Sequence, residues 1–156
     1  MIAWLANRTP VGGCIVVVGP AAWEFAGAAR SDITVYGVDA GAPRERIDAD
    51  PSRQGPSGYQ TKENVFLLSG ESPWDFVGWR RDIDLVYFDG SATPTQFSVD
   101  FWTEFVRTGG VIAGDHPGDD DSEILKTASR LARRLGSRLD LAGSSWSITR
   151  DCNRSP

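Results

Sequence analysis

The chain has few of the residues that most often carry metal or redox chemistry. Its 156 residues include two cysteines, Cys14 and Cys152, and one histidine, His116. The cysteines form no metal-binding or redox motif, and lone thiols are typical of a reducing compartment. We therefore expect both thiols to be free and the protein to be cytoplasmic. Cys14 opens an apolar run, so we expect it to lie in the core.

Long hydrophobic runs are also missing. The longest uncharged apolar stretch covers residues 11–22, which is twelve residues, whereas a membrane-spanning helix needs about 20. Residues 1–13 lack the basic start and the long apolar segment of a secretory signal. These absences predict a protein without a membrane partner.

Positive charge is scarce. The 16 basic residues, 14 arginines and two lysines, stand against 21 acidic residues, which gives a formal net charge of -5. Proteins that bind nucleic acids usually carry a basic patch. We therefore predict no nucleic-acid partner, with a local basic patch on the acidic protein left open. A homo-oligomeric state is also left open.

The composition is that of a globular protein, with 40% hydrophobic and 24% charged residues. The length favours a single domain over residues 1–156. Apolar, β-branched runs predict strands at residues 15–18, 33–38, 64–68, 83–88 and 111–114, with two more at 138–141 and 145–149. Helical patterns separate the first five strands, which favours a three-layer, Rossmann-like α/β fold with a parallel sheet. The last two strands are joined by a tight turn and must be antiparallel. The expected fold is therefore five parallel strands plus a terminal antiparallel hairpin.

Several helix ends carry recognisable signals. Cap and first-turn residues are predicted before three helices, namely Ser72 with Pro73, Thr93 with Pro94, and Asp121 or Ser122. Gly136 is expected to end the third of these helices.

Ligands in an open α/β sheet bind beyond the carboxyl ends of the strands. Asp39 follows the second strand and can accept both ribose hydroxyls of a nucleotide; the alternative is a turn residue before Ala40. Glu71 and Ser72 follow the third strand and would face the same cleft, which is compatible with capping by Ser72. The loop Gly19-Pro20-Ala21 after the first strand has one glycine, so a GxGxxG dinucleotide motif is absent.

The ends of the fourth and fifth predicted strands carry the sharpest signal. Asp89 follows one strand and Asp115-His116 follows the other. Two carboxylates and an imidazole can hold a divalent cation or perform acid–base chemistry. The alternative is that all three are turn or loop residues. Trp23 or Trp74 is a candidate wall of a cofactor pocket, with core or rim packing as the alternative.

The order of these motifs resembles class I S-adenosylmethionine-dependent methyltransferases. The likeness is greatest to the small branch of catechol-type, macrocin-type and "methyltransferase 24" O-methyltransferases. It spans about residues 11–150 and is carried by Ile15 to Gly19, Val35 to Asp39, Leu68 to Ser72, Asp84 to Gly90, Gly109 to His116 and Trp146 to Arg150.

The resemblance implies a seven-stranded sheet with the last strand inserted antiparallel to its neighbours. It implies S-adenosylmethionine as the cofactor, and its binding residues would be Gly19, Pro20, Ala21, Asp39, Ala40, Gly70, Glu71, Ser72 and Asp89. Metal-dependent relatives hold magnesium with acids after the fourth and fifth strands, positions that Asp89, Asp115 and His116 occupy here. Magnesium is therefore a candidate second cofactor. Val17 stands where the family usually has an acid, and Ala21 and Trp23 stand where it has glycines.

Three hypotheses for function follow. The first is a methyltransferase acting on a hydroxyl of a small molecule or sugar, with Asp89, Asp115 and His116 as the catalytic residues. The second is a methyltransferase-like domain that has lost its cofactor loop and binds a partner. The third is a nucleotide or dinucleotide enzyme on a similar sheet. The altered glycine loop disfavours the third, and the strand-end acids favour the first over the second.

Overall fold

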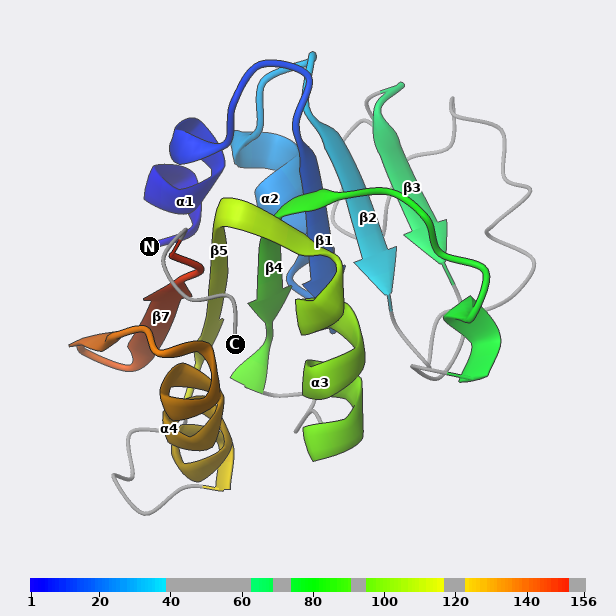
Figure 1. Cartoon of the computed structure of the whole chain (residues 1–156). Helices are drawn as coiled ribbons and strands as arrows, with labels where there is room; N and C mark the ends of the chain where they lie inside the picture. Colours follow the sequence, from blue (N-terminus) through cyan, green and yellow to red (C-terminus); the bar gives the residue numbers. More distant parts are fainter. Residues whose placement is uncertain (39–62, 69–73, 91–94, 117–122, 152–156) are drawn as a thin grey trace.

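The computed structural model describes residues 1–38, 63–68, 74–90, 95–116 and 123–151. Its centre is a seven-stranded sheet in the order β3-β2-β1-β4-β5-β7-β6 (Figure 1). The strands are β1 (Cys14–Val18), β2 (Thr34–Val38), β3 (Val65–Leu68), β4 (Ile83–Phe88), β5 (Val106–Asp115), β6 (Leu139–Ala142) and β7 (Ser145–Thr149).

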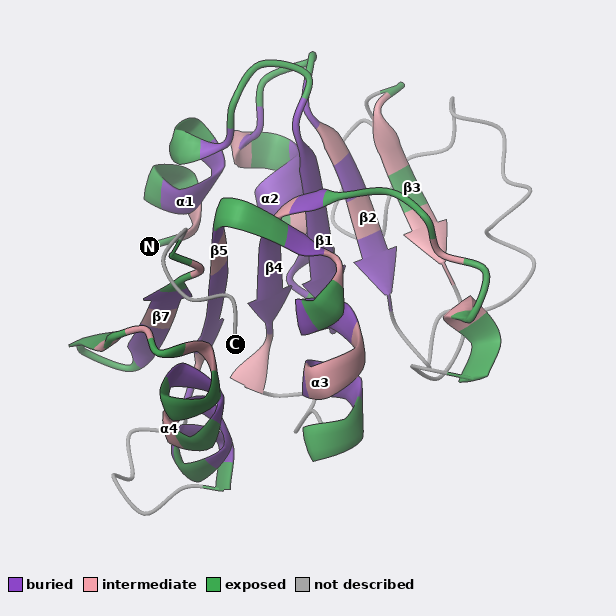
Figure 2. Cartoon of the chain, in the orientation of Figure 1, coloured by how far each residue is buried: buried purple, intermediate pink, exposed green. Residues whose placement is uncertain are grey.

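Strand directions confirm the expected fold class. Strands β1 to β5 pair in parallel, and β7 is antiparallel to both β5 and β6. The inserted last strand that the resemblance implied is therefore present. In Figure 2 the central strands β1 and β4 and the second half of β5 are largely buried, whereas the edge strands β3 and β6 are not. Central parallel strands are covered on both faces, which explains their nearly continuous apolar sequences.

Helices cover both faces of the sheet. The helices α1 (Ile2–Arg8) and α2 (Ala22–Ala28) lie on one face, where Leu5 and Phe25 are buried against the sheet. The helices α3 (Gln96–Glu104) and α4 (Glu123–Leu135) cover the other face with the short 3₁₀ helix η2 (Trp74–Phe76) (Figure 1). No helix of the described residues is both long and apolar enough to cross a membrane.

Two boundaries differ from the sequence-based expectation. Helix α3 does not begin at Pro94: it begins at Gln96, because the Thr95 hydroxyl accepts a hydrogen bond of 3.2 Å from the Ser98 N–H and caps the helix. Strand β5 begins at Val106, well before the expected residue 111. Its register against β4 shifts between the pairs made by Ile83 and Leu85, and Gly109 at φ +79° lies in that irregular part. Gly109 and Gly110 therefore lie within an irregular part of a strand.

Helix α1 was not expected at all. Its N-cap residue, Met1, makes no side-chain cap hydrogen bond, and its first turn holds no acidic residue. Because the usual start signals are missing, the helix depends on packing of Leu5 and Ala6 against the sheet. The predicted caps Ser72, Asp121 and Ser122 lie outside the described residues.

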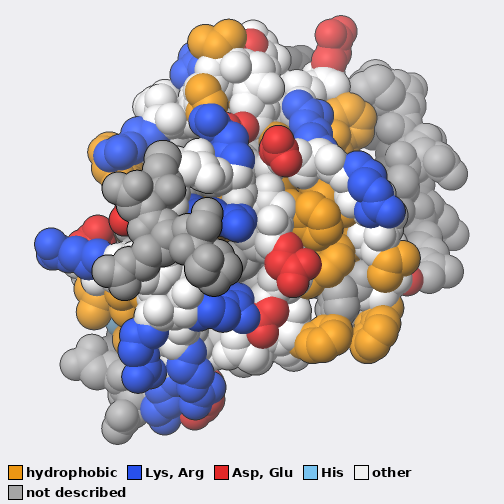
Figure 3. Space-filling view, in the orientation of Figure 1, with side chains coloured by type: hydrophobic (Ala, Val, Ile, Leu, Met, Phe, Trp, Pro, Cys, Tyr) orange, Lys and Arg blue, Asp and Glu red, His pale blue; other side chains and the backbone are white. Residues whose placement is uncertain are grey.

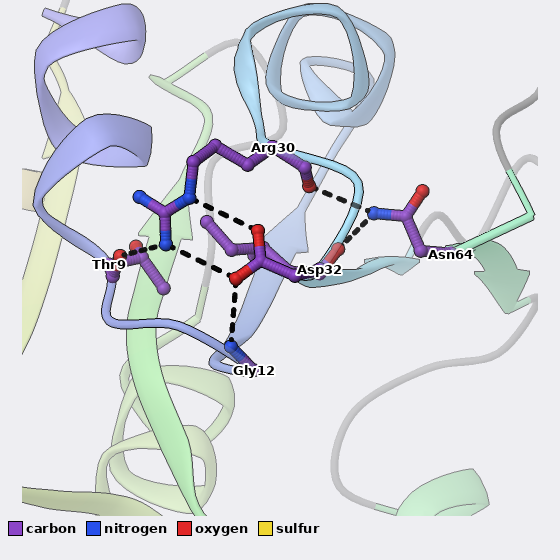
Figure 4. Close-up of polar contacts among 6 residues, drawn as sticks. Thr9, Gly12, Arg30, Asp32 and Asn64 are labelled. Carbon is purple, nitrogen blue, oxygen red and sulfur yellow. Dashed lines mark hydrogen bonds and ion pairs between the residues drawn. The ribbon is translucent and has the colours of Figure 1, made fainter.

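A polar network joins three loops at the amino ends of β1, β2 and β3 (Figure 4). The Asp32 carboxylate accepts hydrogen bonds of 3.1 Å from the Gly12 N–H and from Arg30 Nε. The Asn64 side chain donates to the carbonyls of Arg30 and Ile33. The hydrogen bond from Arg30 is the main reason that the pKa of Asp32 is lowered. These contacts secure the edge of the sheet opposite to the strand ends where ligands are expected.

Cys14 is a buried free thiol, as expected, and burial raises its pKa to about 12. In a Cys152→Ser variant we expect Cys14 to resist a thiol reagent at pH 8 until the protein unfolds, because only the thiolate reacts. The pKa of this thiol is raised from 9.0 to about 12 by folding, so the folded protein keeps its proton at pH values where the unfolded chain loses it. The contribution of this group to the free energy of unfolding is therefore fully present below pH 9 and is lost as the pH rises toward 12. Rapid labelling of the native variant would contradict the buried placement.

Candidate functional site

The carboxyl ends of β1, β2 and β4 meet at one edge of the sheet, toward which their arrowheads point in Figure 1. The chain leaves β1 through Gly19, whose φ of +116° is strained for residues with a side chain. The Gly19 N–H donates to the Val38 carbonyl at 2.8 Å, and the Asp89 N–H donates to the Val18 carbonyl at 3.0 Å. These two hydrogen bonds extend the pairing by one residue and join the three strand ends.

Asp89 supports the loop after β1 with its side chain. Its Oδ2 atom accepts a hydrogen bond of 3.1 Å from the backbone N–H of Ala21, 68 residues earlier in the sequence. Ala21 is the N-cap of α2 and has no capping side chain of its own. The carboxylate of Asp89 therefore binds a backbone N–H of the loop Gly19-Pro20-Ala21, which the resemblance assigns to the cofactor. In this loop Gly19 and Ala21 are buried and Pro20 is exposed.

Asp115, at the end of β5, is held by two hydroxyl groups. Tyr87 Oη donates to its Oδ2 atom, and Ser145 Oγ donates to its Oδ1 atom at 2.7 Å. Burial, the hydrogen bond to Asp115 and the nearby charges of Asp89 and Glu24 raise the pKa of Tyr87 well above its usual value of 10. Tyr87 therefore stays protonated and remains a donor.

Sequence reasoning missed Tyr87 and Ser145. Tyr87 lies within an apolar strand, and its ring packs on Phe25 with centroids 4.8 Å apart. Ser145 opens the last strand and pairs with Asp115 in the β5–β7 ladder. No signal in the sequence places either hydroxyl next to the carboxylate, because the contacts bridge 28 and 30 residues.

The ends of β4 and β5 are in direct backbone contact. A Cβ added to Gly90 would lie 2.8 Å from the carbonyl oxygen of Asp115, closer than real Cβ atoms come. Asp89 and Asp115 both act on the Tyr87 hydroxyl through their charges. The structure thus brings these two carboxylates to one region, as expected from adjacent strand ends.

His116 is directed to the turn between β6 and β7. Its side chain is buried, and its Nε2 atom lies 3.2 Å from the Gly143 carbonyl oxygen. Its backbone N–H donates to the Ser144 carbonyl at 2.8 Å. These contacts tie the residue after β5 to the hairpin. That His116 and Asp89 act together in catalysis stays a prediction.

The other predicted cofactor residues, Asp39, Ala40, Gly70, Glu71 and Ser72, lie outside the described residues. Of the two candidate pocket walls, Trp23 is partly buried, whereas Trp74 is 71% exposed and packs on Phe97 with ring centroids 5.5 Å apart.

A metal site is not formed by the described residues, in which no group of three or more His, Cys, Asp and Glu side chains could hold an ion. Asp115 directs both carboxylate oxygens to hydroxyl groups and Asp89 accepts from a backbone N–H. The residues that the structure describes therefore do not fit the predicted magnesium site, and we derive no step through a metal.

The loop after β1 does fit a cofactor that approaches the backbone closely. Gly19 has no side chain to exclude a ligand from the strand end, and its φ of +116° is a conformation that glycine adopts without strain. The small side chains of Ala21 and Ala22, which follow in the chain, are buried.

No family model matches the sequence, and no curated protein matches it by sequence. Solved structures do match. A presumed rRNA methylase from Clostridium thermocellum has a TM-score of 0.67 at 12% identity, covering 98% of this chain and 94% of that chain. A SAM-dependent O-methyltransferase from Thermotoga maritima has a TM-score of 0.66 at 14% identity, covering 99% of this chain and 65% of that chain.

The MycE methyltransferase of mycinamycin biosynthesis, in complex with Mg and SAH, has a TM-score of 0.64 at 12% identity over 94% of this chain and 44% of that chain. These matches, together with the strand order and the antiparallel last strand, identify the architecture: the chain has the fold of the class I S-adenosylmethionine-dependent methyltransferases.

Proposed function

We propose that the protein is an S-adenosylmethionine-dependent methyltransferase, of the EC 2.1.1 class, that methylates a hydroxyl oxygen of a small molecule or sugar. The observation that carries the proposal is the hydrogen bond from the Ala21 N–H to Asp89, which braces the loop after β1 at the strand ends. In open α/β sheets this edge is where ligands bind. The fold and the O-methyltransferase name of the matched Thermotoga maritima structure support the same reading.

The proposed cofactor site extends over the ends of β1 to β4. Gly19, Pro20 and Ala21 would lie along the methionine part, with Asp89 bracing them. Asp39 and Ala40 would bind the ribose, and Gly70, Glu71 and Ser72 would lie at the adenine. When bound, S-adenosylmethionine supplies an electrophilic methyl group.

Asp115 and His116 are the proposed groups that accept the proton of the attacking hydroxyl. The hydroxyl oxygen would form a bond to the methyl carbon as the bond from that carbon to the sulfonium sulfur breaks, which would leave S-adenosylhomocysteine, and the hydroxyl proton would pass to the base. Asp115 accepts from two hydroxyls, which suits an ionised carboxylate because that form has no donor. His116 is the alternative base, since a neutral imidazole has a ring nitrogen that can accept a proton.

A methyltransferase-like binding domain without catalysis is the second candidate. One observation favours it: both oxygens of Asp115 and the ring of His116 hold parts of the fold together. In that case the chain would bind neither S-adenosylmethionine nor S-adenosylhomocysteine.

Calorimetric titration with both molecules separates the two candidates. We expect binding, and we expect Asp39→Ala to weaken it about 10- to 150-fold, because a charge-assisted hydrogen bond contributes about 1.5–3 kcal/mol and 1.4 kcal/mol is tenfold. Asp140→Ala, which removes an exposed carboxylate from edge strand β6, is the control and should leave affinity unchanged. Absence of binding by the parent chain would favour the binding domain, and equal affinity of parent and Asp39→Ala would make Asp39 a turn residue.

A further inference from the structure

The outer face of α4 concentrates positive charge on an acidic protein. Its exposed basic residues recur at helical spacing and form what we call the α4 stripe, which consists of Lys126, Arg130, Arg133 and Arg134. Figure 3 shows basic side chains gathered at the lower left, where Figure 1 places α4. The chain as a whole carries a formal net charge of -5. A quarter of its 16 basic residues thus lies within nine positions of one helix.

Neighbouring acids offset only part of this charge. Lys126 pairs with Glu123 at 3.2 Å, and Arg134 pairs with Asp100 of α3 at 2.8 Å. Both pairs are largely exposed, and exposed ion pairs contribute about 0–1 kcal/mol, so a stronger anion can displace them. Arg130 and Arg133 have no ion pair with a residue that the structure describes. The acidic residues 119–121 precede the helix and lie outside the described part.

The dimensions of the stripe suit a phosphodiester backbone. Lys126 and Arg134 are eight positions apart, which is about 12 Å along a helix that rises about 1.5 Å per residue. Four basic side chains over that length can each contact a phosphate of one nucleic-acid strand. Arginine also binds phosphate with two parallel N–H donors.

The same face is unlike a membrane or protein interface. The apolar residues of α4, such as Leu125, Ala128 and Leu131, are buried against the sheet. None remains on the outer face to enter a lipid bilayer, which membrane-surface helices do with an apolar side. Protein interfaces likewise have an apolar centre that is poor in charge.

We propose that the α4 stripe binds the phosphate backbone of single-stranded RNA. The choice of RNA rests on the proposed function, which requires a sugar hydroxyl as the methyl acceptor. RNA offers such a group in the 2′-hydroxyl of each ribose, and DNA lacks it. An RNA partner differs from the expectation based on net charge, which was that the protein binds no nucleic acid. Net charge is a sum over the whole chain, and it does not show that basic residues cluster on one face of a helix.

Fluorescence anisotropy of the full chain with a labelled, mixed-sequence single-stranded RNA tests the proposal. We expect binding whose logarithmic salt dependence has a slope of about -2.8, that is about -0.7 for each of four contacts. In the double variant Arg130→Glu/Arg133→Glu, affinity should fall by at least about tenfold and the slope should shrink to about -1.4.

The matched control is Arg8→Glu/Arg80→Glu, which changes the net charge by the same amount at two exposed arginines outside α4. It should keep the parental slope and lose much less affinity. No binding of RNA, or equal loss in the two double variants, would overturn the proposal. So would tighter binding of DNA of the same sequence, of polyglutamate or of anionic vesicles. Calorimetry with S-adenosylmethionine tests the proposed function independently of all these outcomes.

Discussion

Replacing Trp102 with alanine is expected to lower the free energy of unfolding by about 3–5 kcal/mol. Trp102 lies on α3 and is fully buried. Its ring contacts Phe76, Trp79 and Phe101, with centroids 5.3, 5.2 and 5.0 Å away. Removing the indole leaves a cavity among rings that come from two segments, residues 74–80 and α3, and these cannot close it without moving the backbone.

Denaturant unfolding followed by circular dichroism measures this loss. Trp74→Ala is the matched control, because the same side chain is removed where it is 71% exposed. Its effect should stay within about 0.5 kcal/mol. A loss of similar size in the two variants would show that Trp102 is not a centre of the core.

The second large effect is expected for Asp89→Ala, which should weaken binding of S-adenosylmethionine by about 10- to 150-fold. The substitution removes the acceptor of the Ala21 N–H, in a loop where Ala21 is buried. The loop would then rearrange to satisfy that donor, and the backbone presented to the cofactor would change. Asp89→Asn keeps an oxygen acceptor without charge, so its loss of affinity should be smaller.

Asp82→Ala is the control for this experiment, since it removes an exposed carboxylate just before β4, at the opposite end of the same strand. Its affinity should equal that of the parent. Calorimetry gives the affinities, and thermal unfolding of each variant shows whether the fold is retained. Parental affinity in a folded Asp89→Ala would mean that Asp89 does not support the cofactor loop.

Local patterns were sufficient for much of the fold. The fourth strand and the last strand were predicted with the bounds that the structure has, Ile83–Phe88 and Ser145–Thr149. Gly136 ends α4 as expected: it has a φ of +64°, and the Ser137 N–H donates to the Ala132 carbonyl at 3.0 Å. This hydrogen bond across the helix end needs a residue that tolerates positive φ, and glycine does so without strain.

The site was predicted less completely. The carboxylates after β4 and β5 were found because parallel strands end at a common edge. Their partners were not found, because a hydrogen bond such as that between Tyr87 and Asp115 depends on strand register, which a single sequence does not specify. Helix α1 was missed for a related reason, since packing and not capping stabilises it.

The sequence by itself therefore determined the alternation of strands and helices, the fold class and the strand-end acids, since these follow from hydrophobic periodicity and from glycine at turns. Only the tertiary structure decided what those acids contact. Asp89 braces the loop after β1, Asp115 is held by two hydroxyls, and His116 is turned to the β6–β7 hairpin. The basic residues of α4 likewise form a stripe only because the other faces of that helix are buried. Contacts between distant segments set these properties, and a linear pattern does not contain them.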